Sequence, residues 1–155
     1  MPFSGPLGER QLISELIADY CDAVNRRDDV AWGATWDEDS VWSLPFLGIE
    51  GIRGRANIVS TWKQAMGLFS FAHMMAQAGR IDVDGERAVV RCYTAEVTVL
   101  ADSGAERRPC GLYEDVCVKR DGRWLFQSRT FHVLHGAADA PSLPIRSHHR
   151  LSDNH

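Results

Sequence analysis

Apolar positions in the first part of the chain repeat with the period of an α-helix. Between Glu9 and Arg26 they recur every three or four residues and so share one side of a helix: Leu12, Ile13, Leu16, Ile17, Tyr20 and Val24. Asp28 or Asp29 can cap a second, shorter helix, because an aspartate accepts hydrogen bonds from free N–H groups of a first turn. A third helical pattern covers residues 55–66. The first half of the chain therefore predicts three helices that each bury one side.

The period changes farther along the chain. Apolar and polar residues alternate there, as in β-strands, and Asp-Gly pairs with the turn preference of hairpins separate two pairs of these segments. Strands are expected at residues 69–77, 88–100, 111–119 and 124–134, after an earlier one at residues 40–44. Helices followed by a meander of long strands indicate an α+β domain.

Polar and glycine-rich segments mark the expected connections. Residues 37–39 (Asp-Glu-Asp) are expected to turn into the first strand, and residues 45–54 are expected to form a loop. Residues 1–8 are rich in proline and glycine and predict a flexible lead-in. We therefore expect one domain at residues 9–135, followed by an extended tail at residues 136–155.

Size and charge narrow the classes of partner. A chain of 155 residues is long enough for one domain with a core and an enclosed pocket. Its formal net charge of -4 offers no basic face for nucleic acid or anionic lipid, so neither partner is expected. The N-terminus lacks the features of a signal peptide, and no apolar run approaches the roughly 18 residues of a membrane span. Four cysteines without a CxxC pair fit a disulfide-free, cytoplasmic protein.

Four segments, in this order, resemble the SnoaL-like branch of the nuclear-transport-factor-2-like superfamily. They are residues 20–28 (YCDAVNRRD), 36–42 (WDEDSVW), 81–88 (IDVDGERA) and 113–124 (YEDVCVKRDGRW), and the resemblance covers about residues 9–135. It implies a cone-shaped α+β barrel, in which N-terminal helices pack on a strongly curved, mostly antiparallel sheet that encloses a pocket. Members include scytalone dehydratase, bile-acid 7α-dehydratase, hexachlorocyclohexane dehydrochlorinase and ketosteroid isomerases. Other members carry no chemistry, so the fold alone does not decide the function.

His73 is the first candidate for a catalytic group. It lies in the otherwise apolar segment 71–77, and an imidazole can take and return a proton near neutral pH. In the dehydratases that the chain resembles, a histidine at this place is the general base or acid. The alternative is a core histidine whose ring bonds a backbone carbonyl.

Asn25 departs from the pattern of the resembling enzymes, which usually place an aspartate there, paired with the histidine. An asparagine can orient His73 by a hydrogen bond, but it can neither take a proton nor offset a developing charge. Either the chemistry needs a weaker base, or another acid such as Asp22 takes over, or the site is not catalytic. For Asp22 itself, a solvated helix position is favoured.

Tyr20 and Glu96 are further candidates. Tyr20 falls within the apolar stripe of the first helix, so its ring is expected to line the cavity. The resemblance to the bile-acid enzyme implies a phenol that donates to a substrate oxygen, and a plain core aromatic is the alternative. Glu96 shares a strand face with Cys92 and Thr94, and matches approximately an acidic site position of the same enzyme. An outward, solvated glutamate is slightly favoured.

The last strand carries Arg129 and His132. They are an odd number of residues apart, so a regular strand turns the side chain of only one of them inward. Arg129 can hold a carboxylate or stabilise an oxyanion, and it can equally pair with Asp115 or Glu96 as part of the structure. His132 is a candidate substrate-binding residue. Tyr113 is another, because it shares a strand face with Asp115.

A set of large apolar residues completes the candidate substrate-binding site. Its members are Trp42, Phe46, Trp62 and Met75, which would favour an aromatic or polycyclic ligand if they line the pocket. A plain hydrophobic core is the alternative.

Metal and nucleotide motifs are weak. His148 and His149 have no third ligand nearby in the sequence, and no HExxH occurs. The glycines at 48, 51 and 54 lack the GK[ST] of a phosphate loop, and no serine or cysteine elbow is present. Proton transfer and polarisation remain as the available chemistry, with no cofactor or metal expected.

The leading hypothesis is a cofactor-independent lyase, of dehydratase or retro-aldol type, or an isomerase. It would act by proton transfer on a small, largely apolar aromatic or polycyclic hydroxy or carbonyl compound. His73 would move the proton, and Tyr20, Asn25 and Arg129 would position or polarise oxygen. The alternative, which Asn25 favours, is a non-catalytic small-molecule-binding protein or a partner subunit of a larger enzyme. By analogy with the family, the outer face of the sheet would support a homodimer or homotrimer.

Overall fold

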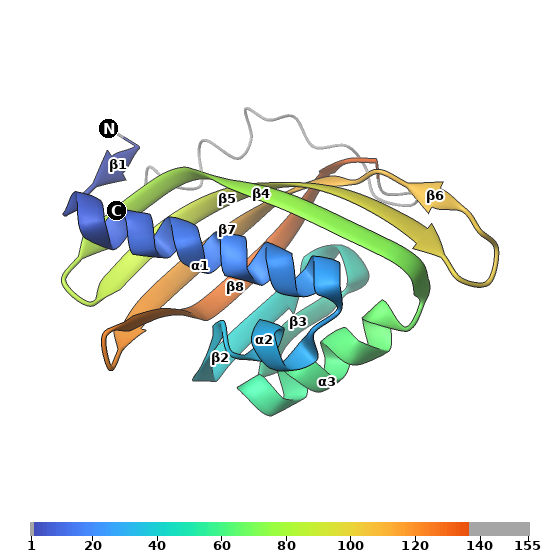
Figure 1. Cartoon of the computed structure of the whole chain (residues 1–155), viewed down its shortest axis with the longest axis horizontal. Helices are drawn as coiled ribbons and strands as arrows, with labels where there is room; N and C mark the ends of the chain where they lie inside the picture. Colours follow the sequence, from blue (N-terminus) through green and yellow to red (C-terminus); the bar gives the residue numbers. More distant parts are fainter. Residues whose placement is uncertain (1, 137–155) are drawn as a thin grey trace.

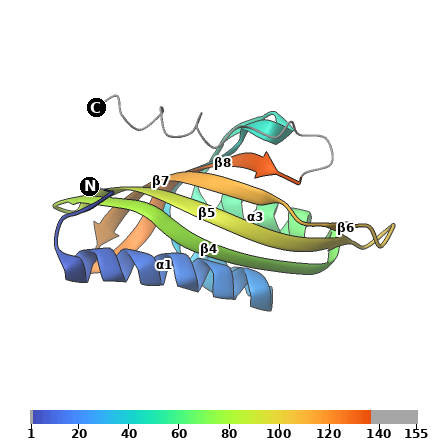
Figure 2. The same cartoon turned by 90° about the horizontal axis from the view of Figure 1, so that it is seen from above.

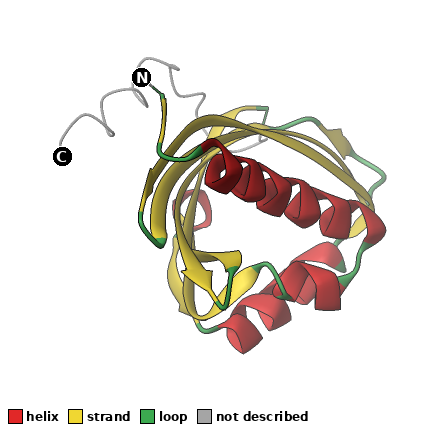
Figure 3. Ribbon diagram, turned by 60° about the vertical axis from the view of Figure 1, so that its left-hand side comes forward, coloured by secondary structure: helices red, strands yellow, loops and turns green. Residues whose placement is uncertain are grey.

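One strongly curved sheet forms most of the molecule, and helices lie on the inner side of its curve (Figures 1 and 3). The computed structural model describes residues 2–136. The helical elements of this part are α1 (Leu7–Arg26), α2 (Asp29–Gly33), α3 (Arg55–Met66) and the short 3-10 helix η1 (Pro45–Leu47). The strands are β1 (Phe3–Ser4), β2 (Trp36–Leu44), β3 (Ile49–Arg53), β4 (Phe69–Asp84), β5 (Arg87–Leu100), β6 (Glu106–Arg107), β7 (Cys110–Arg120) and β8 (Arg123–His135).

The strands follow the order β1-β4-β5-β7-β8-β2-β3, with β6 paired to β5 beside this path. Neighbouring long strands are antiparallel, whereas β1 pairs with β4 and β2 pairs with β8 in parallel. The sheet is therefore mixed and does not close on itself. Seen from above, α1 runs alongside β4, at the side where the sheet ends (Figure 2).

The break between α1 and α2 has a clear local cause. Arg27 adopts a left-handed conformation with φ of 55°, which ends the first helix. The Oδ1 atom of Asp28 then accepts a hydrogen bond from the N–H of Ala31 at 2.8 Å and caps the next helix. The chain thereby reverses direction, and α2 delivers Trp32 to the inner side of the sheet.

Tryptophans dominate the core between the helices and β2. The rings of Trp32 and Trp62 stack with centroids 4.6 Å apart, and Trp36 packs edge-on against Trp32 at 5.5 Å. Phe126 on β8 is fully buried against Trp36. This cluster fills the space between the helices and β2, and Trp62 in it also borders the cavity described below.

The structure confirms the predicted fold class: helices pack on a large, curled and mostly antiparallel sheet. The predicted third helix at residues 55–66 is confirmed, and so are the four long strands, with extended ends. The segment 37–39 is not a turn but part of β2, and residues 49–53 of the predicted loop form β3. Within the predicted lead-in, Phe3 and Ser4 form β1. Except for its first residue, the predicted tail at residues 136–155 lies outside the described part.

All four cysteines are free thiols. Cys21, Cys92 and Cys117 are buried, where they act as small apolar residues, and Cys110 is exposed. Within residues 2–136, no helix combines the length and the apolar character that crossing a lipid bilayer requires.

Candidate active site

A cavity of about 350 Å³ lies inside the curve of the sheet, within the usual range for small-molecule sites. Its wall is mostly apolar and is built from α1, α3 and the inner faces of the strands. The structure places the predicted lining residues Trp42, Phe46 and Trp62 in this wall. The buried N–H at Nε1 of Trp42 has no hydrogen-bond partner within the described chain.

A hollow of similar volume lies between the outward side of α1 and the turn after β7. Asp22 and Arg26 in its wall are solvated and form an ion pair, with Oδ2 and Nε 2.8 Å apart. Asp22 therefore takes the solvated helix position that its sequence context favours.

Glu96 is the acidic group of the cavity. It lies on β5 directly opposite Met74 of β4, and the two side chains share the inner face of the sheet. Within residues 2–136, its carboxylate makes no ion pair and no side-chain hydrogen bond. Burial therefore raises the pKa of Glu96 to about 7, and nothing nearby offsets this effect. Glu96 can thus hold or release a proton near neutral pH.

Two phenols lie beside this carboxyl group. The hydroxyl oxygens of Tyr20 on α1 and Tyr113 on β7 are 3.3 Å apart, and both side chains line the cavity. Burial raises the pKa of Tyr20 to about 12 and holds the pKa of Tyr113 well above its ordinary value. Both phenols therefore stay neutral, and they can donate hydrogen bonds to an oxygen of a bound compound.

Arg129 supports the tyrosine pair from the next strand. Its guanidinium carbon lies 4.3 Å from the ring centroid of Tyr20 and 3.7 Å from that of Tyr113. The Nε and Nη2 atoms donate to the two carboxylate oxygens of Asp115 at 2.8 and 3.0 Å. Burial disfavours the charge of Arg129, but Asp115 outweighs it and raises the pKa above the ordinary value. Arg129 is therefore a fixed cation beneath the phenols.

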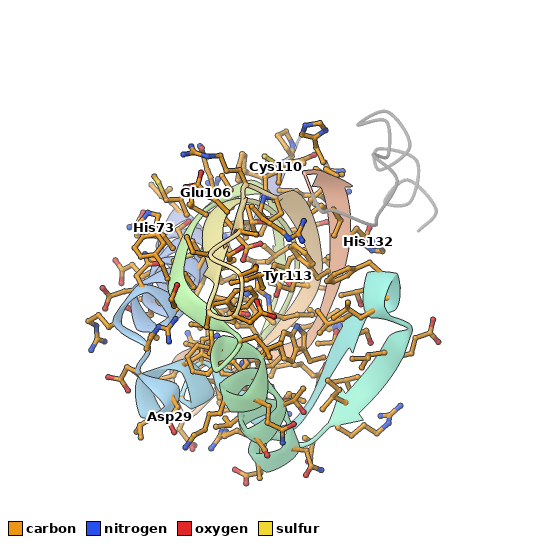
Figure 4. The ribbon with its side chains drawn as sticks, turned by 90° about the vertical axis from the view of Figure 1, so that its right-hand side faces the viewer. Asp29, His73, Glu106, Cys110, Tyr113 and His132 are labelled. Atoms are coloured by element: carbon orange, nitrogen blue, oxygen red, sulfur yellow. The ribbon has the colours of Figure 1, made fainter. Side chains whose placement is uncertain are left out.

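His73 does not join this group. His73 is one of the residues that border the cavity, but strand alternation places its side chain on the face of β4 opposite to Met74, where it is exposed. Figure 4 shows Tyr113 inside the curve of the sheet and His73 on the outer side of β4. Among residues 2–136, no side chain forms a hydrogen bond with its ring.

Asn25 contacts the backbone of β4 rather than the histidine. Its Nδ2 donates to the carbonyl oxygen of Met74 at 3.0 Å, and its Oδ1 accepts from the N–H of Met74 at 2.7 Å. The side-chain amide thus pairs with a strand edge as a neighbouring peptide group would, and we call this arrangement the amide clip. It gives Asn25 a structural role that an aspartate, which lacks the donor, does not fill.

Two predicted substrate-binding residues lie outside the cavity. Met75 is 65% exposed on the outer face of β4, and Met74 takes the inward place, because side chains alternate along a strand. The Nε2 atom of His132 lies 3.0 Å from an Oε atom of Glu114, on the face of β8 opposite to Arg129. Of the two polar residues on β8, Arg129 is therefore the inward one.

The sequence slightly favoured an outward, solvated Glu96, and its pattern did not predict the contact between Tyr113 and Tyr20. A signal for Glu96 was present, since Cys92 and Thr94 share its face and are buried. The inner groups together can exchange a proton at Glu96 and stabilise negative charge on an oxygen beside the tyrosine pair.

Solved structures with the same fold include several whose names denote enzymes. A scytalone dehydratase-like protein from Novosphingobium aromaticivorans DSM 12444 is 22% identical, with a TM-score of 0.78 over 90% of this chain and 94% of that one. A hexachlorocyclohexane dehydrochlorinase from Novosphingobium barchaimii LL02 is 17% identical, with a TM-score of 0.72 over 89% and 96%. A ketosteroid isomerase-like protein from Erwinia carotovora atroseptica SCRI1043 is 19% identical, with a TM-score of 0.75 over 84% and 99%. At these identities the likeness shows the fold.

No curated protein matches the sequence. The model of the SnoaL-like domain matches residues 6–130, which include every element from α1 to most of β8. The chain therefore belongs to the SnoaL-like domain family.

Proposed function

We propose that this protein is a cofactor-independent lyase or isomerase that acts on a small, largely apolar hydroxy or carbonyl compound. Glu96 transfers the proton, and the tyrosine pair binds the oxygen on which negative charge develops. The dehydratase, dehydrochlorinase and isomerase names among proteins of this fold support the reaction class, since each of these reactions removes or moves a proton.

The observation that carries the proposal is a carboxyl group in a largely apolar cavity that forms no ion pair with any residue from 2 to 136. A general acid or base works best when its pKa is near the working pH, and burial brings Glu96 to about 7. An ordinary surface glutamate would be fully ionised there and would be a weaker base. The tyrosine pair lies close enough for the charge of Glu96 to affect both phenols.

Arg129 acts through the tyrosines. A cation under two phenol rings makes their O–H groups stronger donors, which helps when a substrate oxygen becomes an alkoxide or enolate. Its pairing with Asp115 fixes its place, so Arg129 is a positioning residue rather than one that touches the substrate.

In an elimination, Glu96 would take a proton from carbon, the electron pair would form the new double bond, and the leaving group would depart with its bonding electrons beside the tyrosine pair. Glu96 would then pass its proton to the departing group, which leaves as water in a dehydration, and would become a carboxylate again. In an isomerisation, Glu96 would return the same proton to another carbon of the dienolate. Both sequences need only groups that line the cavity, and both return Glu96 to its starting state.

The test compares wild type with Glu96→Gln on a panel of hydroxylated aromatics, polycyclics and hydroxy-carbonyl compounds. Products are read by mass and, for isomers, by chromatography. We expect turnover of one compound class to fall about 10²- to 10⁴-fold in Glu96→Gln, while binding of the same compound persists. Tyr20→Phe removes one donor and is expected to lower kcat by about 10²-fold.

His73→Gln is the matched control, because it changes a titratable group of the same region that faces outward. It should keep wild-type turnover. Turnover that survives in Glu96→Gln would refute the proposal. Compounds that bind wild type and Glu96→Gln equally, with no product from either, would indicate a carrier instead.

A further inference from the structure

We infer that the compound bound in the cavity carries a carboxylate, which Arg107 holds at the mouth while the apolar body extends inward to Glu96. This inference rests on the proposed function for its inner end. It adds the chemical class of the substrate, an apolar carboxylic acid.

The short strand β6 places Arg107 at the cavity. Arg107 pairs with Thr98 of β5, and directly opposed residues of antiparallel strands share a face, so both side chains lie on the inner face. Both residues also line the cavity. The backbone of the same segment is tied to the acid, because the N–H of Glu96 donates to the carbonyl oxygen of Pro109 at 2.9 Å. Arg107 therefore lies opposite Thr98, which is two residues along β5 from Glu96.

The charge of Arg107 is not neutralised within the described chain. The adjacent acid Glu106 forms an ion pair with Arg108 instead, with the Nε atom of Arg108 2.7 Å from the Oε1 atom of Glu106. Arg107 is partly buried and makes no ion pair and no side-chain hydrogen bond with any residue from 2 to 136. Glu96 does not serve as its partner either, since burial alone shifts the pKa of Glu96. The guanidinium and the carboxyl group are therefore two separate polar groups in the wall of one largely apolar cavity.

A carboxylate fits this arrangement better than other anions. A guanidinium matches a planar carboxylate with two parallel N–H donors, and one cation balances one negative charge. A phosphate would bring up to two charges into a wall that offers a single arginine, on a protein of net charge -4. The rest of the lining is chiefly apolar and hydroxyl-bearing, which suits a hydrocarbon or aromatic body.

Binding is tested with matched pairs of probes that differ only in charge: 2-naphthoate against 2-naphthamide, and 2-naphthylacetate against 2-naphthylacetamide. Affinities are measured by calorimetry with wild type, Arg107→Gln, Arg107→Lys and the control Arg108→Gln. We expect wild type to bind each carboxylate about ten- to a hundredfold more tightly than its amide, as charge-assisted hydrogen bonds allow. Arg107→Gln should lose this preference while it still binds the amides. Arg107→Lys should keep part of it, and Arg108→Gln should keep all of it.

Equal affinity of wild type for the acid and the amide would overturn the inference, and so would a preference that survives in Arg107→Gln. Lack of binding by every carboxylate would overturn it as well. The measurement involves no turnover, so it fails separately from the proposed function. If Glu96→Gln loses turnover but wild type shows no preference for carboxylates over amides, the role of Arg107 is refuted and the proposed function stands.

Discussion

Two carboxyl groups lie on the inner face of the same sheet, and their surroundings differ in one respect. Asp115 on β7 receives two hydrogen bonds from Arg129 and is completely buried with it. Glu96 on the neighbouring β5 faces the cavity and has no cation beside it in the described chain. Asp115 is buried and Glu96 is partly buried, and the clearest difference between them is the counter-ion that only Asp115 has within the described chain.

The contrast separates a structural acid from a reactive one. A buried pair with good geometry holds both charges in place, and its proton is not available near neutral pH. A buried carboxyl group without a partner is poised to gain or lose its proton, at a cost to stability whenever it is charged. The carboxyl group of Asp115 thus stabilises the fold through its ion pair with Arg129, whereas we propose that the carboxyl group of Glu96 takes part in the chemistry.

Arg129→Met should give the largest effect on stability. It leaves the charge of Asp115 buried without a partner, and breaking such pairs costs about 3–5 kcal/mol. Urea unfolding at pH 7 measures the loss. The double variant Arg129→Met with Asp115→Leu is the control, because it removes both charges and should recover most of the stability. A single variant as stable as wild type would show that the pair contributes nothing.

Glu96→Gln should stabilise the protein in a pH-dependent manner. The folded pKa of Glu96, about 7, lies above the ordinary glutamate value of 4.5, so wild type loses stability as pH rises between these values. The loss amounts to roughly 3 kcal/mol at full ionisation, given about 1.4 kcal/mol for each pKa unit. Glutamine stays neutral, so the variant should gain this amount on wild type at pH 8.5 and nothing at pH 4.5. Unfolding curves at the two pH values measure the difference, and an equal effect at both would contradict the assigned shift.

Asn25→Asp should destabilise the protein by about 1–2 kcal/mol at pH 7. The carboxylate loses the bond that Nδ2 donates to Met74 and faces the carbonyl oxygen of Met74 instead. Asn57→Asp is the matched control, because the Asn57 amide makes one exposed bond at the start of α3 and its loss should cost less than 0.5 kcal/mol. Thermal unfolding of both variants gives the comparison. Equal losses would show that the amide clip does not stabilise the edge of β4.

The fold was predictable because periodicity follows burial along most of the chain. The helix at residues 55–66 and the long strands each bury one side, and their patterns show it. Residues 37–39 were wrongly predicted to form a turn, because an Asp-Glu-Asp run is typical of turns. In the structure Asp37 is 6% exposed within β2 and pairs with Arg120, so a contact distant in sequence overrides the local preference.

The site was only partly predictable, for two physical reasons. The segment 71–77 is apolar on both strand faces, so its pattern does not show which side is inward, and Met75 and His73 were both expected inside. The raised pKa of Glu96 depends on burial without an ion-pair partner, which no local sequence pattern records. Tyr20 was placed correctly in the cavity wall, because a helix face follows directly from the spacing of its apolar residues.

His73→Gln should have the smallest effect of all. The side chain is exposed and its ring has no side-chain partner among residues 2–136, so the free energy of unfolding should change by less than about 0.5 kcal/mol. Turnover of any substrate found with the compound panel should also stay within about twofold, since no proton passes through a group on the outer face of the sheet. Steady-state kinetics of His73→Gln beside Glu96→Gln measure this. A loss in His73→Gln as large as that in Glu96→Gln would mean that β4 turns its imidazole inward during the reaction. The buried carboxyl group without a counter-ion would then no longer account for the chemistry by itself.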